Sequence, residues 1–316
     1  MKEGRTVLIF LLNVAGIIVF TILLAPLAMP VIDFLSSFIP SLPRVLDAHK
    51  YPGGYDYARV WRTVNQIVMM VFLLANMRRM GFTSLPTLGF PVRTRWKPLL
   101  SQGFFWGLIA YLLVIGIALL LGARSIQIRT PWWLWITEPA EFMLSGVAAG
   151  LVEELIFRGM FFQVLARWIS VTGSMLLTSV LYGSFHLLVD AKVPVKFGTI
   201  DWTVGIRGLQ EHVWVLMHPR AGFFPAFFGL FLMSVVLTYA FIWTGSLYFP
   251  IGLHAAWVFI DKTDNLFLTA GGIRQWLFGS EGMGPALFGW VAMAAFLLYV
   301  AFRYRSRRFH DARVSP

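Results

Sequence analysis

The chain has 316 residues, of which 58% are hydrophobic and only 13% are charged, and its formal net charge is +11. A soluble domain carries about twice this charged fraction, so the composition excludes an ordinary soluble protein and predicts a multi-pass membrane protein. The basic excess does not indicate nucleic-acid binding, because the basic residues cluster at the ends of apolar runs, as membrane topology requires. The sequence contains no cysteine, which excludes disulfides, thiolate metal sites and a cysteine nucleophile.

The first element is an apolar segment that follows Lys2 and Arg5. It resembles a signal peptide, but its apolar core is longer than usual, so we expect a retained membrane span. Because a membrane helix needs roughly 20 mostly apolar residues, the sequence predicts about eight spans: Val7–Ala28, Val60–Met77, Leu99–Leu121, Phe142–Trp168, Ser174–Val189, Phe223–Trp243, Leu247–Ile260 and Pro285–Phe302. We therefore expect an all-α fold, a polytopic transmembrane helical bundle with an intramembrane polar cavity.

Charge on either side of these spans predicts the orientation of the chain. An even number of spans places both termini on one side, and basic residues flank the first span and follow the last one. Both termini are therefore expected to be cytoplasmic. On this topology the two long connections, 30–59 and 190–222, face outward.

Three parts of the chain are expected to differ in role. Residues 1–140 hold the first three spans and their loops, and residues 141–265 hold spans four to seven and the candidate catalytic core. Residues 266–316 hold the last span and a basic cytoplasmic tail.

Charged residues within the fourth span are candidates for function, because charge at membrane depth is costly. Glu154 and Arg158 are four residues apart, so they share a helix face and can form an ion pair that supports the structure. Glu153 is turned about 100° away from Glu154 and has no partner in its own helix. We expect Glu153 to face a cavity or a polar group of another helix, or else to be protonated, and such a carboxylate can act as a base.

Two histidines occur in later spans. His186 lies one turn after Tyr182 in the fifth span, where a histidine by itself is more often a packing residue than a catalyst. His254 follows Pro250 by four residues, and the proline is expected to free a carbonyl and kink the seventh span. One carboxylate and two imidazoles fit water activation, and they also fit a zinc site. The sequence contains neither HExxH nor GxSxG.

These residues resemble the CPBP family (CAAX protease and bacteriocin-processing), which comprises intramembrane glutamic-type endopeptidases. That family carries the motifs EExxxR, FxxxH and an HxxxN-like motif on successive membrane helices. Here EELIFRG, Glu153–Gly159, matches the first motif, and YGSFH, Tyr182–His186, matches the second with tyrosine in place of phenylalanine. The segment Thr244–Val258 resembles the third motif, but Val258 stands at the usual position of the asparagine.

The resemblance implies a role for each matching residue. Glu153 is expected to be the general base, assisted by His186, and His254 to stabilise the oxyanion. Glu154 and Arg158 are expected to hold the architecture. No cofactor or metal is expected, with zinc as the alternative. The implied setting is a multi-pass protein of a bacterial inner membrane that cleaves a membrane-anchored protein or peptide, with the lipid bilayer and no nucleic acid as a further partner.

Val258 is a departure that keeps other functions open. The loss of one oxyanion donor typically lowers the rate by about 10²–10³-fold, and valine cannot replace it. The donor could instead come from Trp257 or Ser184, or the protein could be a non-catalytic membrane adaptor that keeps the site for binding. A proton-coupled transporter is a third hypothesis, although the sequence shows no internal repeat. The sequence does not identify the substrate.

Overall fold

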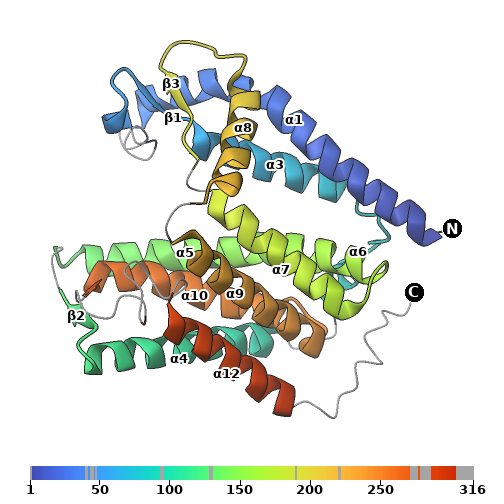
Figure 1. The fold of residues 1–316 in the computed structure, drawn as a ribbon, viewed down its shortest axis with the longest axis vertical. Helices are drawn as coiled ribbons and strands as arrows, with labels where there is room; N and C mark the ends of the chain where they lie inside the picture. Colours follow the sequence, from blue (N-terminus) through green and yellow to red (C-terminus); the bar gives the residue numbers. More distant parts are fainter. Residues whose placement is uncertain are drawn as a thin grey trace. The chain divides into compact units, whose positions relative to one another are not determined.

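The computed structural model describes residues 2–39, 42, 46, 48–92, 96–127, 131–188, 191–219, 222–270, 277 and 286–303. Helices make up most of this part of the chain, with two small antiparallel sheets (Figure 1). The chain divides into two compact units, one comprising Met1–Gly81 with Ser184–Ala221 and the other Phe82–Gly183 with Gly222–Pro316. The expected division by role into residues 1–140, 141–265 and 266–316 stays a prediction.

The first unit pairs its long apolar first helix with a second, less apolar helix. Its elements are α1 (Lys2–Phe38), η1 (Ala48–Lys50), β1 (Gly54–Asp56), α3 (Ala58–Asn76), β3 (Pro194–Lys196) and α8 (Val204–Met217). Between α1 and α3, the Thr21 hydroxyl donates to Asn65 Oδ1 at 3.1 Å, and the Asn76 amide donates to Asn13 Oδ1 at 2.9 Å. Such polar contacts between apolar helices fix their register.

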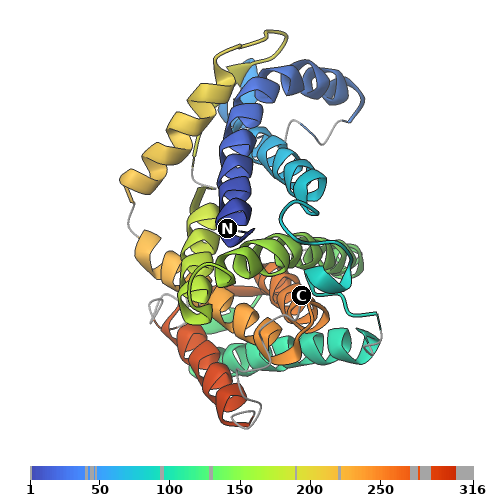
Figure 2. The ribbon, with the colours of Figure 1, turned by 90° about the vertical axis from the view of Figure 1, so that its right-hand side faces the viewer.

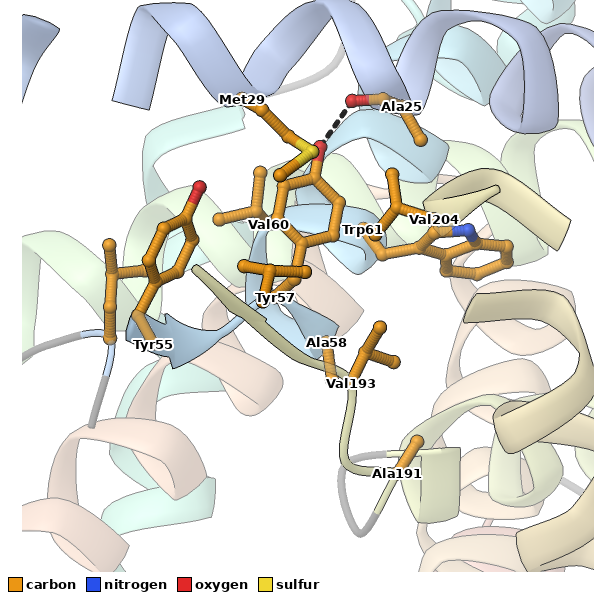
Figure 3. Close-up of a cluster of buried hydrophobic side chains, with 12 residues drawn as sticks. Ala25, Met29, Tyr55, Tyr57, Ala58, Val60, Trp61, Ala191, Val193 and Val204 are labelled. Atoms are coloured by element: carbon orange, nitrogen blue, oxygen red, sulfur yellow. Dashed lines mark hydrogen bonds between the residues drawn. The ribbon is translucent and has the colours of Figure 1, made fainter. Parts of the chain in front are cut away.

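A buried core joins α1 and α3 to the segment around β3 (Figure 3). The Tyr57 hydroxyl donates to the carbonyl of Ala25. Asp56 Oδ1 accepts the backbone N–H of Ala58 at 3.0 Å and that of Val193 at 2.9 Å. The two strands β1 and β3 then pair in antiparallel register. Residues from both long connections are therefore held in one folded core.

The second unit contains the remaining helices and one sheet. Its elements are η2 (Pro86–Leu88), α4 (Trp96–Leu120), β2 (Arg124–Ile126), α5 (Leu134–Glu154), the π-helix η3 (Leu155–Phe162), α6 (Gln163–Ala166), most of α7 (Val171–Leu187), α9 (Phe223–Thr244), α10 (Tyr248–Phe267), β4 (Leu268–Ala270) and α12 (Leu287–Arg303). Strands β2 and β4 pair in antiparallel register. Helix α10 lies between α4 and α5 (Figure 1), and α12 packs on α9 and α4 (Figure 2).

Glycines allow α10 to lie close to both of its neighbours. A Cβ atom on Gly252 of α10 would lie 2.0 Å from the carbonyl oxygen of Leu100 in α4. A Cβ atom on Gly150 of α5 would lie 3.0 Å from the carbonyl oxygen of Ile251 in α10. Small residues at such positions let helix backbones approach closely. This packing brings the acidic end of α5 beside the middle of α10.

Each predicted span contains a helix, but fewer helices meet the requirements for crossing a bilayer. Within the described residues, three are long and apolar enough to do so, namely Leu8–Phe38, Trp96–Leu120 and Phe223–Thr244. Leu287–Leu298 is apolar but shorter. These helices suit a membrane protein, whereas the count of eight spans and the intramembrane cavity stay predictions. Residues 304–316, which include most of the predicted basic tail, lie outside the described part.

The structure adds to two expectations and corrects a third. The connection 190–222 contains β3 and α8, and two small sheets, whose strands have three residues each, accompany the expected helices. Pro250 is the third residue of α10, where a backbone N–H has no partner within the helix. The carbonyl four residues before Pro250 belongs to Ser246, which precedes the helix and accepts the Thr244 hydroxyl at 2.9 Å. The proline therefore frees no carbonyl within the helix, and that prediction is wrong.

Candidate functional site

The site begins where α5 changes into a π-helix. Glu153 and Glu154 are the last two residues of α5, and η3 follows with Arg158 in its middle. Short π-helical segments are rare and occur frequently at functional sites. The acidic pair and the arginine therefore lie at an irregular point of the backbone, which the periodicity of the sequence did not reveal.

Glu154 and Arg158 form the ion pair that their spacing predicted. Arg158 Nη1 donates to Glu154 Oε1 at 2.8 Å, and both side chains are completely buried. Two residues of α9 complete the shell of the guanidinium. Nη2 donates to Ser234 Oγ at 2.8 Å and to its carbonyl at 3.0 Å, while Nε donates to Thr238 Oγ1 at 3.3 Å. The arginine thus ties η3 to α9 through charge-assisted hydrogen bonds.

His254 connects the two glutamates. Its Nδ1–H donates to Glu154 Oε1 at 2.9 Å, and its Nε2 lies 3.8 Å from Glu153 Oε2. His254 is 1% exposed and Glu154 is fully buried, whereas the Glu153 side chain keeps 21% of its surface exposed. Of the alternatives expected for Glu153, the structure places a polar group of another helix, His254, beside it. The bond from His254 to Glu154 was not expected.

Tyr182 of α7 also packs against this cluster. Its ring centroid lies 6.3 Å from that of His254 in an edge-on arrangement, and the Arg158 guanidinium carbon lies 5.0 Å from the centre of the tyrosine ring. The tyrosine is fully buried and interacts with the carboxylate of Glu153. Its phenol therefore belongs to the same polar cluster as both glutamates.

The other predicted residues lie at the edges of this cluster or in the other unit. His186 is in the last turn of α7, one turn after Tyr182, and belongs to the first unit, so its assignment to the site stays a prediction. Val258 lies one turn after His254 on α10 and is half-buried. Asp261, seven residues after His254 on α10, accepts the Tyr111 hydroxyl at 2.8 Å.

The cluster defines what the site can do chemically. Because Glu154 accepts from Nδ1–H, His254 presents Nε2 toward Glu153, and a second proton on Nε2 would make an imidazolium between two carboxylates. With both glutamates ionised and His254 protonated, the charges of the cluster, including Arg158, sum to zero. Among the described residues no group of three His, Asp or Glu side chains could hold a metal ion. The expectation that the protein needs no cofactor or metal, with zinc as the alternative, stays a prediction.

A buried acid–base cluster on apolar helices is typical of a membrane hydrolase or of a proton-translocating protein. Comparison with known proteins favours the first class. Residues 131–260 match the family described as Rce1-like, type II CAAX prenyl endopeptidase Rce1-like, which confirms the resemblance drawn from the motifs. The matched segment includes Glu153, Tyr182, His186 and His254. No curated protein and no solved structure matches the chain.

Proposed function

We propose that this protein is an intramembrane endopeptidase that hydrolyses a peptide bond of a membrane-associated or lipid-anchored protein. The observation that carries the proposal is His254, which touches Glu154 through one ring nitrogen and faces Glu153 through the other. The match to a protease family over the same residues supports the reaction class.

Glu153 is the proposed general base. It is the one carboxylate of the pair that retains solvent exposure, and its Oε2 lies beside His254 Nε2. In the proposed reaction a water molecule gives a proton to Glu153 while its oxygen bonds to the peptide carbonyl carbon. The C–N bond then breaks, and the proton passes to the departing nitrogen. His186 is the proposed assistant of Glu153, as the resemblance implies.

His254 is the proposed stabiliser of the negative oxygen that forms during attack. This role requires an N–H on Nε2, hence an imidazolium, because Nδ1–H is already given to Glu154. The carboxylate of Glu154 accepts the other ring N–H, and Arg158 in turn holds that carboxylate in place. Glu154 is therefore proposed as a positioning residue for His254 as well as a partner of Arg158.

Tyr182 is the proposed second donor to the same oxygen. Val258 offers no donor on α10, and Trp257 packs against apolar clusters formed by α4, α9 and α10. The Tyr182 phenol, in contrast, lies against Glu153, His254 and Arg158. A buried neutral donor stabilises the negative oxygen more than a donor in water does, because the protein already holds it in place and it does not have to reorient during the reaction.

The test compares the membrane peptidome of cells that carry the native chain with cells that carry Glu153→Gln, using terminal mass spectrometry. The matched control is Glu141→Gln, which removes the same charge from an exposed position of α5. New peptide termini are expected with the native chain and with Glu141→Gln, and they should vanish with Glu153→Gln.

Identical termini in all three samples, with each variant folded and inserted, would refute the protease. Capture of a membrane peptide without cleavage would then indicate the adaptor, and pH-driven flux in liposomes would indicate the transporter.

A further inference from the structure

Helix α8 has an exposed apolar stripe beside its buried face. Its buried residues are Val204, Gly205, Gly208 and His212. Ile206, Val213 and Met217 are spaced by seven and four residues, so they lie along one line of the helix, and Trp202 lies one turn before Ile206. All four are exposed, and Met217 reaches 71%. Glu211, also exposed, lies on the third side, while Gln210, four residues after Ile206, interrupts the apolar stripe.

The depth of α8 follows from its contact with α1. Exposed apolar side chains occur along α1 from Leu8 to Phe38, about 45 Å of helix at 1.5 Å per residue. The hydrocarbon core of a bilayer is about 30 Å thick, roughly 20 helical residues. Every stretch of that length within Leu8–Phe38 includes Ile22. A Cβ atom on Gly205 would lie 2.0 Å from the Ile22 carbonyl oxygen. The start of α8 therefore lies beside the part of α1 that crosses the membrane.

Helix α8 crosses α1 and α3 and does not run along them (Figures 1 and 2). Trp61 of α3 contacts α8 over two turns. Its indole N–H donates to the Gly205 carbonyl at 2.9 Å, and its ring stacks on His212 with centroids 4.4 Å apart. Between these two contacts, a Cβ atom on Gly208 would lie 2.2 Å from the Trp61 ring. With 14 residues, α8 is about 21 Å long, which is too short to span a bilayer.

We propose that α8 lies in the interface of the membrane and that its apolar stripe, formed by Trp202, Ile206, Val213 and Met217, contacts lipid acyl chains. Helices of this kind carry apolar and aromatic residues on the lipid side and polar residues on the other. Glu211 then faces the headgroups and water. The stripe is thus covered by the same lipid that covers the exposed apolar surface of α1 in the same unit. The proposal is independent of the protease activity.

The absence of cysteine in the chain makes a direct test possible. The full-length protein, with a single nitroxide label at Val213→Cys, Met217→Cys or Glu211→Cys, is reconstituted in phosphatidylcholine vesicles. Labels at Val213 and Met217 are expected to collide more with dissolved oxygen, which enters hydrocarbon, than with a water-soluble nickel chelate. The label at Glu211 should show the reverse preference. Leu12→Cys on α1, which is 61% exposed, provides the reference for a lipid-facing position.

Three results would overturn the proposal. If Met217 is as accessible to nickel as Glu211, α8 lies in water. If Val213 and Met217 are shielded from both reagents, protein covers the stripe, either from this chain or from a second copy. If Glu211 prefers oxygen as strongly as Met217 does, α8 is immersed in hydrocarbon and not interfacial.

Discussion

The buried pair of Glu154 and Arg158 leads to a prediction whose size follows from the structure. Removal of one partner leaves the other charge buried without compensation, which typically costs about 3–5 kcal/mol. Glu154→Gln keeps an oxygen that can accept from His254, so it removes the charge with little change in shape. It leaves Arg158 with three contacts to neutral groups of Ser234 and Thr238. We expect destabilisation by about 3–5 kcal/mol for this variant and for Arg158→Met.

The double variant separates the ion pair from the other contacts of its members. If the pair acts as a unit, Glu154→Gln with Arg158→Met should be less destabilised than the sum of the two single variants, by about 0.5–3 kcal/mol. The assay is unfolding in mixed micelles with a rising fraction of sodium dodecyl sulfate, followed by tryptophan fluorescence. Lys192→Met is the control, because Lys192 is half exposed although it lies 3.4 Å from Asp56. It should change the free energy of unfolding by at most about 1 kcal/mol.

Two outcomes would refute this reasoning. In the first, the free energy of unfolding of each single variant lies within about 1 kcal/mol of the native value. The charge left without its partner would then cost far less than a buried uncompensated charge should. In the second, the double variant loses as much unfolding free energy as the two single variants together. The two side chains would then act independently despite the 2.8 Å contact.

Three further predictions concern the donors of the site and the start of α8. Tyr182→Phe keeps the ring and removes the hydroxyl, so it should lower kcat by about 10²–10³-fold with little change in KM; an unchanged kcat would exclude the phenol as a donor. Val258→Asn supplies the donor that valine lacks, so it should raise kcat in the same substrate assay. An unchanged kcat would show that this position does not face the reacting oxygen. Burial acts to raise the pKa of Asp201, but hydrogen bonds from Thr203 and the charge of Arg207 outweigh it and hold that pKa below its usual value of 3.8. The carboxylate therefore stabilises the start of α8 above pH 3.8, and this contribution is lost as the pH falls through the lowered pKa. A spin label at Ile206→Cys should become more mobile below pH 3.8 in the native background, and Asp201→Asn should remove this pH dependence.

The sequence by itself determined the local features of this protein. Apolar runs of sufficient length predicted where the helices lie, because a helix in lipid satisfies its own backbone hydrogen bonds. The four-residue spacing of Glu154 and Arg158 predicted their ion pair, since residues at this spacing share a helix face. The order of the three motifs indicated the resemblance to the family, and the match over residues 131–260 confirmed that resemblance.

Only the tertiary structure decided which polar groups meet. Glu154 and His254 are separated by 100 positions, and their hydrogen bond exists because glycines on α5 and α10 let these helices approach closely. The π-helix at Leu155–Phe162 and the position of α8 against Ile22 likewise depend on packing between distant segments. Periodicity describes one helix at a time and carries no information on the neighbour that a face will contact. The sequence therefore predicted the pairing of Glu154 with Arg158, which lies four residues away. Its second partner, His254, depends on how the helices are arranged.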